Sequence, residues 1–178
     1  MDTHMLIWAL NGDPKMSKDI RPHITEVLKD NLPVYFSHVS LLEMALLFSR
    51  RKLLYGSPLL KYGEMLQSLY KDALDVGFQP LRLSLVHLQA LADLPYPPSG
   101  HRDPFDRLLV AQALTVNLHL VSKDQALSVY FQTTPLRLLG QTENNYPSAS
   151  RPTIRRARKA AATSAISRNT LSSSNTGR

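Results

Sequence analysis

Segments with helical and strand-like patterns alternate along most of this 178-residue chain. The strand-like segments are short, rich in β-branched and aromatic residues, and cover residues 33–37, 78–83, 118–122 and 133–138. The segments with helical character cover residues 5–10, 18–30, 40–47, 58–76, 85–94, 106–113 and 124–130. Such repeated alternation favours a parallel sheet with helices on both faces. We therefore expect an α/β fold.

The composition narrows the class of protein. The length suits a single domain with a substantial core. The chain has no cysteine, which excludes disulfides and thiolate metal sites and favours a reducing, cytoplasmic location. No apolar run approaches the length of a membrane span, and the N-terminus lacks a basic-then-apolar signal pattern, so we expect no membrane association.

The net charge of +7 is concentrated near the C-terminus. Residues 1–140 hold 14 Lys and Arg against 13 Asp and Glu, whereas residues 141–178 hold seven Lys and Arg against Glu143 alone. The second segment has few large apolar residues, so we expect it to be disordered and residues 1–140 to form the folded domain. This basic tail (residues 141–178) is either a solvated extension or an arm that adds non-specific affinity for RNA or DNA.

Two carboxylates stand at the start of a strongly apolar helix in residues 101–113. Pro104 suits the first helical turn, and Asp106 begins a pattern of apolar residues that should bury one helical face. Asp103 is either an ordinary helix N-cap or an accessory acid of a functional site.

Three further acids lie beside apolar segments elsewhere, and they are Asp2, Glu43 and Asp124. Together with Asp106, each follows a strand-like segment or lies in the helix that is entered from one. Ligands of parallel sheets gather at the carboxyl ends of the strands. The four acids can therefore converge at one edge of the sheet.

The acids stand within four short motifs. In chain order these are Asp2-Thr3-His4 followed by Leu6, Trp8 and Leu10; Ser37-x-x-Ser40-x-x-Glu43; His101-Arg102-Asp103-Pro104-Phe105-Asp106-Arg107-Leu108-Leu109; and Ser122-x-Asp124. In these motifs, over residues 1–139, the chain resembles the PIN-domain ribonucleases, and within them the VapC-type toxins of toxin–antitoxin pairs. The resemblance implies a three-layer α/β/α sandwich with a short parallel sheet. It also implies cleavage of RNA with Mg²⁺ or Mn²⁺, a cognate VapB-like antitoxin, and a homodimer.

The resemblance also implies roles for individual residues. Asp2, Glu43, Asp106 and Asp124 would be the metal ligands and catalytic acids, and the hydroxyls of Thr3 and Ser122 would support those ligands or a bound water. The chemistry agrees, because crowded carboxylates repel by up to about 4 kcal/mol per close pair at an effective dielectric near 20. Oxygen ligands of this kind favour Mg²⁺ or Mn²⁺ over zinc.

Several basic residues are candidate contacts for the RNA backbone. Arg50, Arg51, Lys52 and Arg102 would contact phosphates without reading sequence, although a solvated helix end and an exposed loop explain them equally well. Arg107 is expected to brace carboxylates through an ion pair.

The remaining expectations concern local structure and the start of the chain. The Ser40-x-x-Glu43 spacing predicts a capping box at a helix start. Only Met1 precedes Asp2, so the first strand of the family fold is expected to be truncated here. A truncated strand leaves a second hypothesis open, that of a catalytically weak, degenerate PIN-like module that only binds RNA or an antitoxin.

Deleting residues 141–178 tests the role predicted for the basic tail. We expect residues 1–140 to stay folded and RNA binding to depend less steeply on salt, because seven cationic groups are lost. Thermal melting and binding titrations at several salt concentrations measure both effects. Unfolding of the shortened chain would show that the tail is structural.

Overall fold

A computed structural model describes residues 1–97, 99–134 and 137–139 of the chain. The chain divides into two units, Met1–Gln141 and Thr142–Arg178, and the description below concerns the first unit. The predicted basic tail, residues 141–178, lies outside the described residues.

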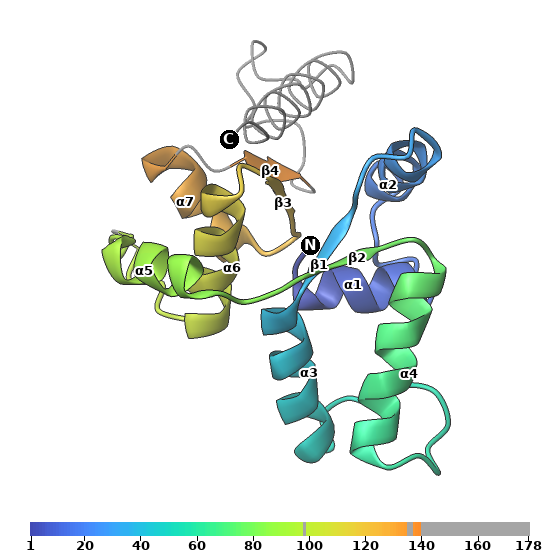
Figure 1. The fold of residues 1–178 in the computed structure, drawn as a ribbon. Coiled ribbons are helices and arrows are strands. Elements are labelled where there is room, and N and C mark those ends of the chain that lie inside the picture. Colours follow the sequence, from blue (N-terminus) through green and yellow to red (C-terminus); the bar gives the residue numbers. More distant parts are fainter. Residues whose placement is uncertain (98, 135–136, 140–178) are drawn as a thin grey trace, which may run out of the picture. The chain divides into compact units, whose positions relative to one another are not determined.

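Helices and short strands alternate through the first unit (Figure 1). The elements are α1 (Thr3–Leu10), α2 (Ile20–Lys29), β1 (Tyr35–Ser37), α3 (His38–Ser49), α4 (Tyr62–Asp75), β2 (Gln79–Leu81), α5 (Leu85–Asp93), α6 (Pro104–Thr115), β3 (His119–Val121), the 3-10 turn η1 (Gln125–Leu127), α7 (Ser128–Thr133) and β4 (Arg137–Leu139). The α/β fold expected from the alternating pattern is confirmed. None of the described helices is long and apolar enough to cross a membrane.

The strands pair in parallel, but as two separate pairs. In the first pair β1 lies beside β2, with Phe36 opposite Pro80. In the second pair β3 lies beside β4, with Leu120 opposite Leu138. Each strand has three residues, so each pair has only a short ladder of backbone hydrogen bonds.

The first two residues connect the two strand pairs. The α-amino group of Met1 donates to the carbonyl oxygen of Tyr35 in β1 at 3.0 Å. The backbone N–H of Asp2 donates to the carbonyl oxygen of Val121 in β3 at 2.9 Å. Met1 and Asp2 thus occupy the place of a strand between β1 and β3, although they are too few to form one.

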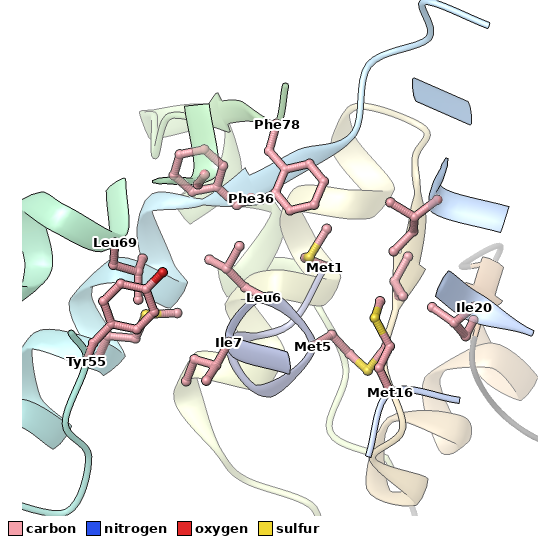
Figure 2. Close-up of a cluster of buried hydrophobic side chains, with 14 of the residues drawn as sticks. Met1, Met5, Leu6, Ile7, Met16, Ile20, Phe36, Tyr55, Leu69 and Phe78 are labelled. Carbon is pink, nitrogen blue, oxygen red and sulfur yellow. The ribbon is translucent and has the colours of Figure 1, made fainter. Parts of the chain in front are cut away.

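Two hydrophobic cores lie on opposite faces of the strands. Successive side chains of a strand point to opposite faces, and in β3 Leu120 and Val121 belong to different cores. The first core is built by residues of α1 to α4, with Phe36 of β1 and Phe78 above Leu6 and Met1 (Figure 2). The second core is built mainly by α6, η1 and α7. The strands therefore lie between two helical layers.

Single residues determine where α3 begins and where α4 ends. Helix α3 begins at His38 and is capped by Ser37, whose hydroxyl accepts from the N–H of Val39 at 2.9 Å. The capping box predicted from Ser40 to Glu43 is therefore wrong: Ser40 lies inside the first turn and is fully buried. Helix α4 is followed by Gly77, whose φ of 96° suits a residue without a Cβ.

Adding residues before Met1 tests the role of the connecting segment. A Lys-Leu-Leu-Leu extension with its own initiator should lie between β1 and β3 and bury apolar side chains, each worth roughly 1.5–3 kcal/mol when fully buried. We expect the free energy of unfolding to rise by about 2 kcal/mol or more. Denaturant titration measures this change.

A Lys-Gly-Gly-Gly extension is the matched control, because it moves the terminal charge equally and adds no side chains to bury. Burial lowers the pKa of the Met1 α-amino group to about 6. The amine therefore opposes folding less as pH rises from about 6 to 8, and both extensions should remove this dependence. Equal stability of the two extended proteins would contradict the proposed strand placement.

Candidate functional site

Asp106 lies in the first turn of α6 at the centre of a group of acids. Burial, and then the charges of Asp103, Asp124 and Glu43, raise the pKa of Asp106 to about 6. These acids come from three separate parts of the chain, and all lie near enough to Asp106 to act on its charge. Of the other predicted ligands, Glu43 and Asp124 therefore lie near enough to Asp106 to affect its pKa, as does Asp103.

Glu43 is held by a hydroxyl from another helix. It lies in α3, and its Oε2 accepts a hydrogen bond from Oγ1 of Thr3 in α1 at 2.5 Å. Thr3 itself is buried at 2% exposure. The contact brings the start of α1, and with it Asp2, to the helix that carries Glu43.

The other acids each use a side-chain oxygen to accept hydrogen bonds at the start of a helix. Asp2, which is buried, accepts from the N–H of Met5 at 2.7 Å. Asp103 accepts from the N–H groups of Phe105 and Asp106 at 2.9 and 3.1 Å. Asp103 is therefore the N-cap of α6, as one of its two interpretations predicted.

Asp124 follows the same pattern at the end of β3. Its side chain accepts from the N–H of Ala126 at 2.8 Å, and its own N–H donates to Oγ of Ser122 at 2.9 Å. Ser122 is fully buried. The hydroxyl predicted to support Asp124 thus does so through the backbone, since it fixes the turn that presents this acid.

His101 is a neighbour of Asp106 whose role the sequence left open. Its Nε2 lies 3.1 Å from Oδ2 of Asp106, and its ring packs edge-on against Tyr130 with 6.0 Å between ring centroids. The positive form of His101 favours ionised Asp106 and opposes the effect of the acids. The His-Arg-Asp-Pro order placed His101 near this site without indicating its partner.

Arg107 does not brace a carboxylate, and that prediction is wrong. Its guanidinium donates to the carbonyl oxygens of Leu94 at 2.6 Å and Pro95 at 3.1 Å. It also lies over the ring of Tyr96, 3.9 Å from the centroid. Because Arg107 is buried and points toward the end of α5, it fastens α5 and the loop after it to α6.

The predicted RNA contacts are exposed. Arg50, Arg51 and Lys52 follow α3, and Arg102 precedes α6. Arg51 has a φ of 54°, in the left-handed region, and its Nε donates to the hydroxyl of Tyr62 at 3.1 Å. This bond directs one of the four cations toward α4, while Arg102 lies 6.0 Å from the ring centroid of Tyr96.

The donor set has the chemistry of a site for a hard cation. Glu43, Asp106 and Asp124 offer only oxygen atoms, and their mutual repulsion is a cost that a bound cation would remove. Within the described residues, no three acidic or histidine side chains lie together closely enough to hold a metal ion. A metal site therefore stays a prediction from the type and grouping of these residues.

Comparison with known proteins supports the fold. No family model and no curated protein sequence matches the chain. Among solved structures, the chain is similar to one in VapBC2 from Rickettsia felis bound to a DNA fragment from their promoter. The match has a TM-score of 0.51 and 17% identity, and it covers 76% of this chain and 92% of that one. At this identity the likeness shows the fold alone, which is the PIN-type α/β fold expected from the sequence.

The raised pKa of Asp106 predicts how stability depends on pH. Its folded-state pKa of about 6 exceeds the ordinary value of 3.8, so folding favours the protonated form. The resulting stability is complete below about pH 4 and is lost as pH rises through about 6, by an amount on the order of 1–2 kcal/mol because solvent screens this partly exposed carboxyl. Asp106→Asn should keep that stability at pH 7.

Urea titrations at several pH values measure the effect, and Asp19→Asn is the control. Asp19 is exposed at the start of α2 and caps no N–H with its side chain. The control should follow the wild type between pH 4 and 7. If Asp106→Asn also follows the wild type, the pKa of Asp106 is not raised in solution.

Proposed function

We propose that this protein is a metal-dependent endoribonuclease, the toxin of a toxin–antitoxin pair. The observation that carries the proposal is the set of acids near Asp106, because burial and then the charges of Asp103, Asp124 and Glu43 raise the pKa of Asp106. Carboxylates that repel one another are kept where a cation or a reaction uses them. The PIN-type fold, similar to a chain of a VapBC2 complex, supports the same conclusion.

Each acid would have a distinct part in holding the cation. Glu43, Asp106 and Asp124 would be ligands, and Asp2 at the start of α1 would be the fourth. Bound Mg²⁺ or Mn²⁺ supplies the activation of a water molecule and the neutralisation of charge on the phosphoryl group. Protonated Asp106 is a poor ligand, so the protein would bind the cation more tightly above pH 6 than below it.

The protein's own residues would position the site and the substrate. Thr3 fixes one oxygen of Glu43, and Ser122 fixes the turn before Asp124. Arg50, Lys52 and Arg102 are exposed and would contact RNA phosphates. Such contacts position a strand without reading its sequence.

The solved structure supports a proposal about partners. It holds VapBC2 from Rickettsia felis bound to a DNA fragment from their promoter. We propose that this chain binds a small VapB-like antitoxin and forms a homodimer in the cytoplasm.

An RNA cleavage assay tests the proposed activity. Purified full-length protein should cut single-stranded RNA with Mg²⁺ or Mn²⁺, and EDTA should stop it. Glu43→Gln and Asp106→Asn should each lower the rate at least about a hundredfold, since each removes one charged ligand. Glu26→Gln is the matched control, because Glu26 is an exposed residue of α2. This variant should cleave RNA at the wild-type rate.

One observation favours a second function, that of a module that binds RNA or an antitoxin without cleaving it. Asp2, Asp103 and Asp124 each hold a backbone N–H, and no three acids of the described residues are grouped tightly enough for a metal ion. Thermal melting with and without millimolar Mn²⁺ separates the two functions. A nuclease should be stabilised by the cation, because it binds the native state, and a pure binding module should not be.

A further inference from the structure

A row of buried polar side chains connects three helices away from the acids. Ser37, His87 and Gln112 are 4%, 4% and 1% exposed. They belong to the start of α3, to α5 and to α6. Burying such groups costs free energy unless they are paired, so their mutual contacts are informative.

The contacts form one directed chain. The hydroxyl of Ser37 donates to Oε1 of Gln112. On the other side, Nε2 of Gln112 lies 3.5 Å from Nδ1 of His87. Gln112 therefore uses both ends of its amide, one toward α3 and the other toward α5.

The protonation of His87 agrees with this direction. Its Nδ1 accepts from the backbone N–H of Ser84 at 3.1 Å, so the ring proton is on Nε2. Burial lowers the pKa of His87, which favours the neutral ring. Nδ1 also lies 3.0 Å from Oγ of Ser84, so the 3.5 Å contact with Gln112 is the weaker end of the row, and the hydrogen bond between Gln112 and Ser37 is its stronger end.

Ser37 makes the row more than a packing contact. The hydroxyl that donates to Gln112 also accepts from the N–H of Val39, and it thereby caps α3. The first turn of α3 is thus fastened to α6 by the atom that begins the helix.

The two helices joined in this way carry two of the acids. Glu43 lies six residues after Ser37 in α3, and Asp106 lies six residues before Gln112 in α6. Six helical residues span about 9 Å, so a tilt of roughly 6° at the contact moves an acid by about 1 Å. Displacements of that size can change a rate about a hundredfold.

We propose that Gln112 is a positioning residue that holds α3 against α6, so that Glu43 and Asp106 can bind the same cation. This role rests on the proposed function, because it concerns the site that would bind the cation and cleave RNA. Gln112 itself touches neither acid. It acts through Ser37 on the direction of α3 and through its own helix on Asp106.

Replacing Gln112 by methionine tests the proposal. Gln112→Met keeps the length of the side chain and removes both hydrogen bonds. We expect Mn²⁺ binding, measured by calorimetry well below the melting temperature, to weaken at least about tenfold, and kcat for RNA cleavage to fall at least as far. The KM for RNA should change less than about threefold, because the RNA contacts lie elsewhere.

A matched control separates positioning from general loss of stability. Leu69→Ala removes a fully buried side chain of α4 in the first core, away from the row. It should lower the melting temperature at least as much as Gln112→Met and leave Mn²⁺ binding within about twofold. If both variants weaken Mn²⁺ binding in proportion to their melting temperatures, Gln112 is only structural.

A double mutant tests the connection from the other end and serves if Gln112→Met folds poorly. Ser37→Ala should also weaken Mn²⁺ binding, and adding Gln112→Met to it should weaken binding little further, because both break one contact. Additive losses would overturn the connection. If the wild type is active and Gln112→Met binds Mn²⁺ and cleaves RNA equally well, this inference alone is overturned. If the wild type neither binds Mn²⁺ nor cleaves RNA, the proposed function is overturned and the inference with it.

Discussion

The backbone hydrogen bonds of Met1 and Asp2 are the interactions on which the rest of the structure depends. They join β1 to β3, and within the part of the chain that the structure describes β1 otherwise pairs with β2 and β3 with β4. With three residues per strand, the ladders alone contribute little, so packing of the two cores against this connection must supply most of the stability. The same residues begin α1, and Thr3 reaches Glu43 from there. Sheet and candidate site are therefore assembled by one short segment.

The acids illustrate how one side chain can serve both stability and chemistry. Asp103 and Asp124 cap helical turns, a contribution worth about 1 kcal/mol each, and they also raise the pKa of Asp106. Removing either would weaken a cap and relieve a repulsion at the same time. The net change in stability is thus smaller than the larger of the two effects, and it understates how strongly these residues determine the electrostatics of the site.

The sequence predicted the order and type of the elements, because periodicity and turn residues are local signals. Asp103 could be named as a candidate N-cap for that reason. The start of α3 could not be assigned, since Ser37 and Ser40 are both good N-caps and the length of β1 decides between them.

Long-range polar contacts could not be predicted from the sequence. Arg107 was expected to pair with a carboxylate, but it donates to carbonyl groups at the end of α5. The path of the chain there makes these groups available, and no residue pattern predicts that path. Gln112 looked like an ordinary helical residue, and its partner Ser37 lies 75 residues away. The grouping of the acids was predicted through the order of the motifs, whereas the hydroxyl that holds Glu43 was predicted only in general terms.

The guanidinium of Arg107 has a consequence for how the protein responds to acid. It binds the carbonyl groups of Leu94 and Pro95, and neither partner titrates. Arginine stays charged at every physiological pH. The joint between α5 and α6 is thus insensitive to acidification over the interval in which Asp106 gains its proton. A fall in pH through about 6 would therefore change the charge of Asp106 without loosening this joint.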